Sequence, residues 1–320
     1  MKTIAAAALI CLIIALVLPL SLAPGAWDGA EPEEGAPAAG AGGGTEFTVL
    51  SGGEVGRGDM AGYLPGVVAA EMPALFEPDA LKAQAVAARS FILSRTLTVN
   101  ANHPEADVCD DPDCCKAHNT EEELREKWGG DYDEYWQKML SAVRETDGQY
   151  LEYGGEPIFA AFHSSSAGMT EDSGEVWNAL PYLVSVPSPE DEEDVPDYVT
   201  TVTYTEGEFA SRLREGYPYL SLGQDPAGWV EEVTMDESGR VSSVTIAGQE
   251  VPGTEVRSLF ELRSTAFELE YASGSFTFTV TGYGHGVGMS QYGANVLAGL
   301  GTPYTDILAH YYPGTELVEG

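Results

Sequence analysis

Apolar residues recur at helical spacing over several stretches of the chain. With proline and glycine at the breaks, this pattern predicts five helices. They cover residues 60–72, residues 78–97, residues 131–146, and the segments that follow Met289 and Tyr304. Pro73 and Pro78 separate the first two helices, and Gly148 ends the third.

Alternation of apolar and polar residues predicts strands between these helices. Two hairpins are expected, one from Gln149 to Ser165 and one that joins the segments FELEY and FTFTV at Ser273-Gly274. Further strands are expected at Val199–Tyr204 and Val241–Ile246. Because helices and strands are grouped rather than regularly alternating, the pattern predicts an α+β fold of mixed helices and antiparallel strands.

The amino-terminal part has a different pattern. An uncharged apolar run from Ile4 to Ala23, about 20 residues long, is sufficient to span a bilayer. A cleaved signal segment is the alternative, although its apolar core is usually shorter. Lys2 before the run and acidic residues after it predict that the rest lies outside the cytoplasm. The expected organisation is a transmembrane anchor or signal segment at 1–23, a flexible acidic Gly/Ala/Pro linker at 24–45, and one folded domain at 46–320.

Charge excludes one class of partner. The chain has 51 acidic and 15 basic residues, which gives a formal net charge of −36 at pH 7. A protein that binds nucleic acid needs basic stripes to neutralise phosphates, so no nucleic-acid partner is expected.

The helix predicted at residues 60–72 carries a carboxylate on its apolar side. Leu64, Val67 and Val68 form the buried stripe, and Glu71 follows on the same stripe. Partial burial and the negative end of the helix dipole favour the protonated carboxyl, the form that a general acid needs. The alternative is a glutamate that reaches out of the groove to water.

Two cations share a face of the next predicted helix. Lys82 and Arg89 lie seven residues apart and could hold an anionic or carbonyl-bearing substrate. Ordinary surface charge is the alternative.

Three of the four cysteines lie in one short segment, whereas Cys11 falls in the apolar run. Together with two histidines the segment offers five soft donors, which is enough for a closed zinc site of three thiolates and one imidazole. These donors are His103, Cys109, Cys114, Cys115 and His118. One disulfide beside a reduced thiol is the alternative.

The segment Gly282 to Gly288 is rich in glycine but is too close to the end of the chain for a complete dinucleotide-binding βαβ unit. Its glycines let the backbone approach a ligand or tightly packed neighbours. His285 is either a groove residue or a structural histidine. His163, Ser164 and Ser166 form a polar turn whose hydroxyls could bind sugar, with a Ser–His nucleophile pair as the competing interpretation.

Three long segments resemble, in order, the signature segments of the stage II sporulation protein D family. They are LPGVVAAEMPALFEPDALKAQAVAARSF from Leu64, FHSSSAGMTEDSGEVWNALPYLVSV from Phe162, and GYGHGVGMSQYGANVLAGLG from Gly282. The resemblance covers residues 46–320. It implies one grooved catalytic domain that cleaves peptidoglycan as a lytic transglycosylase, anchored in the engulfing membrane of a spore-forming bacterium.

In such an enzyme one carboxyl group suffices, and no cofactor is needed for the chemistry. The resemblance implies that Glu71 protonates the glycosidic oxygen and then takes the proton of the muramic acid 6-hydroxyl, which closes a 1,6-anhydro ring. The candidate substrate-binding residues are Lys82, Arg89, His163, Ser164, Ser166, Tyr182, His285, Gln291 and Tyr292. Val184 stands where the family often has a lysine.

The same resemblance implies a structural zinc ion held by His103, Cys109, Cys114 and Cys115. It also implies partners: glycan strands as substrate, a cell-wall amidase that strips stem peptides, and a membrane protein that holds the engulfment complex. A single-pass location follows, with the domain in the intermembrane space of the sporulating cell. The two alternatives are a non-catalytic module that enhances an amidase and a zinc-dependent cell-wall hydrolase.

Overall fold

The computed structural model describes residues 46–112 and 114–320. The anchor expected at 1–23 and the linker expected at 24–45 lie outside the described residues. Within the described ranges, no helix is both long enough and apolar enough to cross a membrane.

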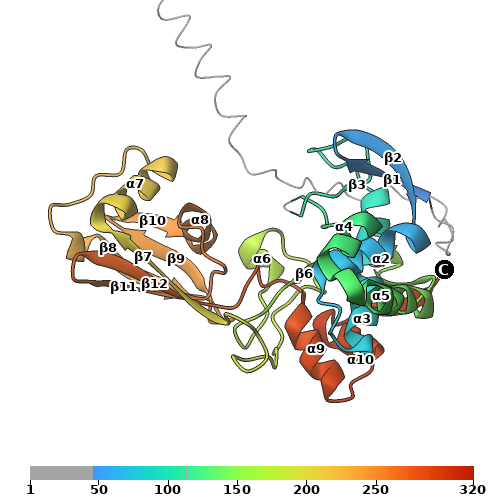
Figure 1. Cartoon of the computed structure of the whole chain (residues 1–320). Coiled ribbons are helices and arrows are strands. Elements are labelled where there is room, and N and C mark those ends of the chain that lie inside the picture. Colours follow the sequence, from blue (N-terminus) through green and yellow to red (C-terminus); the bar gives the residue numbers. More distant parts are fainter. Residues whose placement is uncertain (1–45, 113) are drawn as a thin grey trace, which may run out of the picture. The chain divides into compact units, whose positions relative to one another are not determined.

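Helices gather around a first hydrophobic core (Figure 1). Three of them, α2 (Met60–Glu71), α3 (Pro78–Thr96) and α5 (Tyr132–Glu145), pack on one another. Two later helices, α9 (Gln291–Gly299) and α10 (Tyr304–Tyr311), pack against α3. The first core therefore unites segments from both ends of the described sequence.

Small sheets edge this helical core and join segments that are distant in sequence. Their strand orders are β2-β1-β3, β14-β4-β5 and β13-β6. The strands are β1 (Glu46–Ser51), β2 (Glu54–Asp59), β3 (Val108–Cys109), β4 (Gln149–Tyr153), β5 (Glu156–Pro157), β6 (Phe162–His163), β13 (Met289–Ser290) and β14 (Glu316–Glu319). Short helices complete this part, namely α4 (Glu121–Trp128), η2 (Gly129–Asp131) and α6 (Ser173–Val176).

The segment from residue 199 to residue 281 builds a second hydrophobic core, with Phe209, Phe260, Phe276 and Phe278 fully buried. Two antiparallel sheets, β11-β12-β7 and β10-β9-β8, surround it. The elements are β7 (Val199–Thr205), α7 (Glu206–Gly216), η3 (Pro226–Gly228), β8 (Val230–Met235), β9 (Val241–Ile246), β10 (Gln249–Pro252), α8 (Gly253–Leu259), β11 (Phe267–Ala272) and β12 (Ser275–Thr281).

The predicted α+β class is confirmed, and the five predicted helices and the predicted strands are present. Two pairings, β1 with β3 and β6 with β13, are parallel rather than antiparallel. The pattern did not predict α4, α6, α7 or α8. Of these, α4 and α7 each begin with a capping box, Thr120 with Glu123 and Thr205 with Glu208. The T-x-x-E spacing of those boxes is a signal that the sequence does contain.

Candidate active site

Glu71 is the last residue of α2, and Met72 after it has extended backbone geometry. The backbone N–H of Ala117 donates to Oε1 of Glu71 at 3.2 Å. The side-chain amide of Gln291 donates to Oε2 at 3.3 Å. The Glu71 carboxyl group thus has one protein donor on each oxygen. The residue is only partly buried, so the carboxyl group also reaches solvent.

Residues 115–119, here called the strap, run along α2. The backbone N–H of Asn119 donates to the carbonyl of Gly66 at 3.2 Å. The His118 ring stacks on Tyr63, with 4.4 Å between the ring centroids. These contacts hold the strap against α2. They therefore fix the Ala117 N–H beside the Glu71 carboxyl group, which α2 carries.

The parallel pair β6 and β13 brings the other two signature segments to the same place. Its register sets Ser290 opposite His163, and Gln291 follows as the first residue of α9. The Ser290 hydroxyl caps that helix by accepting from the Gly293 N–H at 3.1 Å. Three segments far apart in the sequence thus converge on one carboxyl group.

The glycine-rich segment from Gly282 to Gly288 packs closely against neighbouring backbone and side chains. Gly282, Gly284, Gly286 and Gly288 all have positive φ, where side chains are strained. A Cβ on Gly284 would lie 2.8 Å from Cβ of His163, and one on Gly288 would lie 2.0 Å from the carbonyl oxygen of Ala161. Of the two interpretations of these glycines, the contacts favour tightly packed neighbours.

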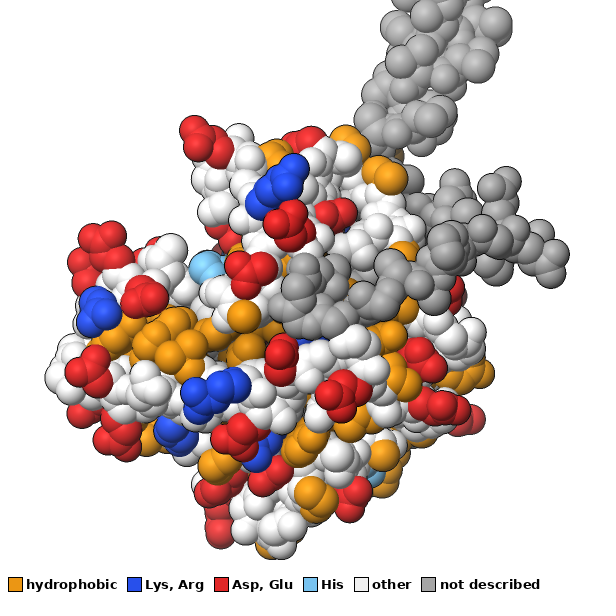
Figure 2. Space-filling view, turned by 90° about the vertical axis from the view of Figure 1, so that its right-hand side faces the viewer, with side chains coloured by type: hydrophobic (Ala, Val, Ile, Leu, Met, Phe, Trp, Pro, Cys, Tyr) orange, Lys and Arg blue, Asp and Glu red, His pale blue; other side chains and the backbone are white. Residues whose placement is uncertain are grey.

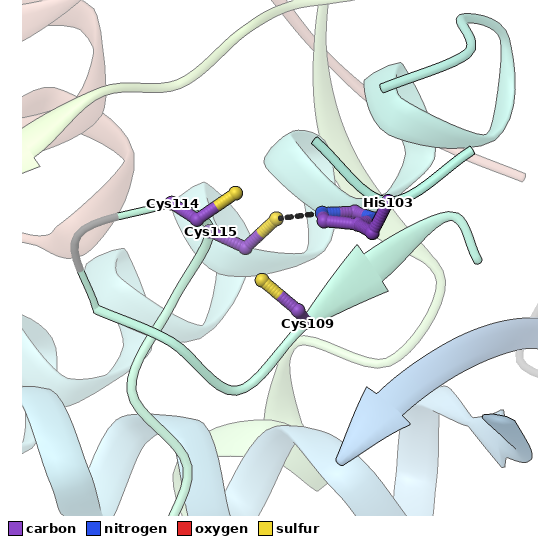
Figure 3. Close-up of side chains that lie close together, drawn as sticks. All are labelled: His103, Cys109, Cys114 and Cys115. Carbon is purple, nitrogen blue, oxygen red and sulfur yellow. Dashed lines mark hydrogen bonds between the residues drawn. The ribbon is translucent and has the colours of Figure 1, made fainter. Parts of the chain in front are cut away.

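The four predicted metal ligands lie together beside the strap (Figure 3). The ligand atoms of His103, Cys109, Cys114 and Cys115 all lie within 4.8 Å of one another. The three cysteines are free thiols, so the alternative of one disulfide is not what the structure contains. A group of one imidazole and three thiols at this spacing could hold a metal ion, and the donor set suits zinc.

The surroundings of the cluster also suit a cation. Nδ1 of His103 lies 2.9 Å from the Ala106 carbonyl, so this nitrogen carries the proton. Nε2 is therefore an acceptor, with the Asn100 amide nitrogen at 2.8 Å and the Cys115 thiol at 3.2 Å. Burial raises the pKa of Cys109 to about 12 and also raises the pKa of Cys115. A divalent ion would supply the positive charge that turns such thiols into thiolates.

His163 and Ser166 are both buried. Nε2 of His163 lies 2.7 Å from the Ser166 hydroxyl, and its Nδ1 lies 3.2 Å from the Val287 carbonyl. Burial holds the pKa of His163 well below its usual range. Because Ser166 is fully buried, the structure disfavours both a sugar contact by this hydroxyl and its use as a nucleophile.

His285 occupies a more open position next to an aromatic side chain. Its ring centroid lies 4.8 Å from that of Trp177, which is 46% exposed. Burial of the imidazole, followed by the charge of Lys116, lowers the pKa of His285 to about 3. The ring is therefore neutral at neutral pH. Its Nδ1 accepts from the Val287 N–H at 3.1 Å, and the backbone of Phe162 forms another hydrogen bond with the ring, so the contacts favour a structural histidine.

Arg89 and Lys82 do not join this group, contrary to the expectation for both. Arg89 is 2% exposed, and its guanidinium donates to the carbonyls of Gln149 and Val143, so it ties the core together. Lys82 forms an ion pair with Glu145 at 2.7 Å. Both cations are already bound to other parts of the fold.

The remaining candidates divide between core and site. Tyr182 is 8% exposed and belongs to the first core, where its hydroxyl accepts from the Phe159 N–H at 3.2 Å. Tyr292 is partly buried and meets Phe76 edge to face at 4.9 Å. Ser164 stays partly exposed and accepts the Tyr292 N–H at 3.0 Å through its carbonyl, which places it beside Gln291.

Two charged residues near the site, Lys116 and Glu190, were not among the candidates predicted from the sequence. Lys116 of the strap has its ammonium 3.7 Å from the ring centroid of Phe162, and burial lowers its pKa to about 8. Glu190 is 2% exposed and accepts from the Ser166 N–H and from the hydroxyls of Ser188 and Ser290. Only the tertiary fold brings these residues to the site, so spacing in the sequence gave no signal for them.

On the face of the molecule shown in Figure 2, acidic side chains are more frequent than basic ones. This distribution agrees with the formal net charge of −36. A negatively charged ligand would therefore be repelled over most of the surface and would need local cations to dock.

Comparison with known proteins identifies clear relatives. The SpoIID family, described as Stage II sporulation protein, matches residues 53–153. Stage II sporulation protein D of Bacillus amyloliquefaciens is 40% identical over 259 residues, which cover 80% of this chain and 73% of that protein. The protein of the same name from Bacillus subtilis (strain 168) is 39% identical over 260 residues, covering 80% and 74%. The Amidase enhancer of the same strain is 29% identical over 314 residues, covering 79% of this chain and 40% of that protein.

Proposed function

Because the chain belongs to the stage II sporulation protein D family, we propose that it is a lytic transglycosylase that cleaves the glycan strands of peptidoglycan. The observation that carries the proposal is the partly buried carboxyl group of Glu71, which accepts one hydrogen bond on each oxygen, from the Ala117 N–H and from the Gln291 amide. Glycan strands stripped of their peptides are the proposed substrate, and spore engulfment is the proposed setting.

The proposed chemistry uses Glu71 twice. The protonated carboxyl donates its proton to the glycosidic oxygen as the bond to the anomeric carbon breaks. The carboxylate that remains then takes the proton of the muramic acid 6-hydroxyl, whose oxygen bonds to the anomeric carbon and closes the 1,6-anhydro ring. The Ala117 N–H and the Gln291 amide keep the carboxyl group in place through both steps.

The Cys/His cluster fits a structural role in this scheme. When bound there, zinc would supply four fixed bonds to His103, Cys109, Cys114 and Cys115 and would leave no position for substrate. The cluster would thereby anchor the start of the strap, whose Ala117 contacts Glu71. A closed donor set of this kind argues against the zinc-dependent hydrolase.

The test is mass spectrometry of the products that the full chain releases from peptidoglycan and from amidase-stripped glycan. We predict 1,6-anhydro-muramic products from the parent protein and at least a ~100-fold loss in the Glu71→Gln variant, because a general acid contributes about 10²–10⁴-fold. Glu77→Gln, at an exposed glutamate six residues further along, is the matched control and keeps full activity. Products with reducing ends would instead identify a hydrolase.

A second function is favoured by one comparison, since a relative bears the name Amidase enhancer. A non-catalytic glycan-binding module would stimulate a cell-wall amidase equally well as the parent protein and as the Glu71→Gln variant. Binding of glycan without any anhydro products, together with such stimulation, would replace the first proposal with this one.

We also propose where the protein acts. The segment 1–23, with its apolar run from Ile4 to Ala23, would tether it to the cell membrane, with residues 46–320 outside the cytoplasm. A cell-wall amidase and a membrane protein of the engulfment complex are the proposed partners. Protease added to intact protoplasts would then remove the domain, whereas a domain that survives such treatment would contradict this location.

A further inference from the structure

Two basic side chains from different segments lie over the same aromatic ring. Arg95 belongs to the last turn of α3, and Lys116 belongs to the strap. The Lys116 ammonium lies 4.4 Å from the ring centroid of Phe91, and the Arg95 guanidinium lies 5.6 Å from the same centroid. Arg95 also lies over the ring of Phe159, at 5.8 Å. Arg95 and Lys116, here called the cation pair, are thus held side by side on aromatic rings.

The cation pair has no ion partner among the residues that the structure describes. Within residues 46–112 and 114–320, the basic residues that form ion pairs with carboxylates are Arg57, Lys82, Arg125, Arg212 and Arg240. Nε of Arg95 is moreover a buried donor without a hydrogen-bond partner in these ranges. Since the chain has 51 acidic and only 15 basic residues, two neighbouring cations without a carboxylate are an exception.

The aromatic rings hold the two cations in place but do not neutralise them. The face of a phenyl ring attracts a cation, although the ring carries no net charge. Burial lowers the pKa of Lys116 to about 8, the charge of Glu71 acts against this shift, and the charge of Arg95 adds to it. Because an anion bound to both cations would offset their mutual repulsion, the cation pair favours a negatively charged ligand.

The cation pair is next to the candidate acid. Ala117 follows Lys116 in the strap, and its N–H donates to Oε1 of Glu71 at 3.2 Å. The Glu71 carboxyl group is held by Ala117 and Gln291 and forms no ion pair with Lys116. A ligand that is cleaved at Glu71 therefore has a positive charge nearby, one residue along the strap from the donor that contacts the carboxyl group.

An exposed aromatic side chain beside the cation pair suits a sugar. Trp177 is 46% exposed, and its ring meets that of Phe159 edge to face at 6.2 Å. Arg95 lies over the same Phe159 ring. An indole next to a cation can pack against the apolar face of a pyranose ring while the cation binds a charged substituent of that sugar. A site for a free inorganic anion would have no use for such a platform.

The metal cluster offers a competing explanation for the two positive charges. Cys115, one of its candidate ligands, precedes Lys116 directly. Three thiolates and a neutral imidazole around a divalent ion carry one net negative charge. One such charge does not neutralise two cations, so the cluster leaves the cation pair with positive charge for a ligand.

We propose that Arg95 and Lys116 form a subsite that binds a carboxylate substituent of the glycan strand beside the bond that Glu71 cleaves. On the proposed substrate this group is the lactyl carboxylate of a muramic acid residue that carries no peptide. The inference rests on the proposed function and deepens it, because it assigns recognition of the strand to residues other than the acid. In a peptide-substituted residue the same group is an uncharged amide, which the cation pair attracts less.

The experiment measures binding in the full chain that also carries Glu71→Gln, so that the strand is not cut. The two probes are amidase-stripped glycan and the same glycan with its carboxyl groups converted to uncharged amides. Arg95→Gln and Lys116→Gln should each weaken binding of the stripped glycan at least ~10-fold and leave the already weaker binding of the amidated glycan unchanged. Arg95→Lys and Lys116→Arg keep the charge and should retain most of the affinity.

The matched controls are Arg214→Gln on α7 and Lys127→Gln on α4, which remove exposed cations and change the net charge equally. Both controls should bind the two probes as the Glu71→Gln protein does. Equal unfolding temperatures and equal metal contents of all variants would show that the fold and the cluster are intact.

Two results would overturn the subsite. The first is an unchanged affinity of Arg95→Gln and Lys116→Gln for stripped glycan, which together with a reduced metal content would assign the cations to the cluster. The second is an equal loss of affinity for the stripped and the amidated glycan. Anhydro products are scored separately with Glu71 intact, so failure of the subsite and failure of the catalytic proposal give different results.

Discussion

Close packing near the site requires glycine at single positions of the segment from Gly282 to Gly288. Gly288 has a φ of +72°, and a Cβ on it would lie 2.0 Å from the carbonyl oxygen of Ala161. That oxygen belongs to rigid backbone and accepts the Met289 N–H at 3.2 Å, so it has no room to move aside. We therefore predict that Gly288→Ala lowers the free energy of unfolding by about 2–4 kcal/mol, measured by denaturant titration.

Gly299 provides the comparison for that substitution. It ends α9, its φ is not positive, and a Cβ on it would have nothing within 4 Å. Gly299→Ala should be neutral or slightly stabilising, since alanine is favoured over glycine in helices. A similar stability for the two variants would show that close packing does not determine the segment from Gly282 to Gly288.

His285 should make the protein sensitive to mild acid. Burial, and then the charges of Lys116, Arg257 and Arg240, lower the pKa of His285 to about 3 in the folded state. An unfolded histidine takes up a proton near pH 6.5, so this contribution to stability is complete above that value and is lost as the pH falls toward 3. One such group changes the free energy of unfolding by about 1.4 kcal/mol between pH 7.5 and pH 5.5.

The measurement is the difference in unfolding free energy between those two pH values. His285→Asn should reduce the acid-induced loss by about 1.4 kcal/mol, whatever its effect on stability at pH 7.5. The same substitution at His310, on α10, removes a histidine that lies outside the candidate site and serves as the control. An unchanged pH dependence in His285→Asn would show that this imidazole titrates normally in the folded protein.

At the scale of elements, the strap links the Cys/His cluster to the candidate acid. Cys115 is both a predicted ligand and the first residue of the strap, and Ala117 two residues later donates to Glu71. We predict that removing the metal with a chelator, or the ligand by Cys109→Ser, raises hydrogen–deuterium exchange in peptides that cover residues 100–119. Exchange in α7 and α8, which belong to the second core, should not change.

Metal content measured by mass spectrometry accompanies that experiment. The chelator should have no further effect on the Cys109→Ser variant, which has already lost a ligand. Unchanged exchange in residues 100–119, after loss of the metal has been demonstrated, would disprove the link between cluster and strap.

Local patterns explain which elements and site residues the sequence could predict. The helical spacing of apolar residues, with proline and glycine at the ends, was sufficient to predict α2, α3 and α5. The four candidate metal ligands could be predicted because they lie close together in the sequence. Arg89 was expected to contact the substrate because it shares a helix face with Lys82, yet β4 and α5 cover that part of α3 and bury it. Which face of a helix is covered depends on the elements that pack on it, and the helix's own sequence does not contain that information.

Glu190 illustrates the same limit for a loop. Its surroundings, PSPEDEEDVP, have the composition of an exposed acidic loop, and the residues from Asp191 to Asp194 are indeed exposed. Glu190 is instead 2% exposed because two donors from distant segments, Ser166 and Ser290, converge on its carboxylate together with the neighbouring Ser188. A buried carboxylate of this kind is paid for by hydrogen bonds that only the assembled fold provides.

At the scale of the whole molecule, the formal net charge of −36 destabilises the compact state through self-repulsion. Salt screens such repulsion, since the Debye length falls from about 10 Å at 0.1 M to about 3 Å at 1 M. Apart from the buried pair of Arg240 and Glu171, the ion pairs of the described residues are at least partly exposed, so their weakening in salt costs little. We therefore predict that the unfolding temperature rises as sodium chloride increases from 0.1 M to 1 M.

A charge variant separates screening from a general salt effect. Glu192→Gln combined with Glu193→Gln removes two exposed carboxylates from the acidic loop and leaves the buried Glu190 untouched. If self-repulsion is the cause, this variant is more stable than the parent at 0.1 M, and the difference between them shrinks at 1 M. A constant difference at all salt concentrations would mean that salt acts through apolar burial instead, because that contribution does not depend on the two charges.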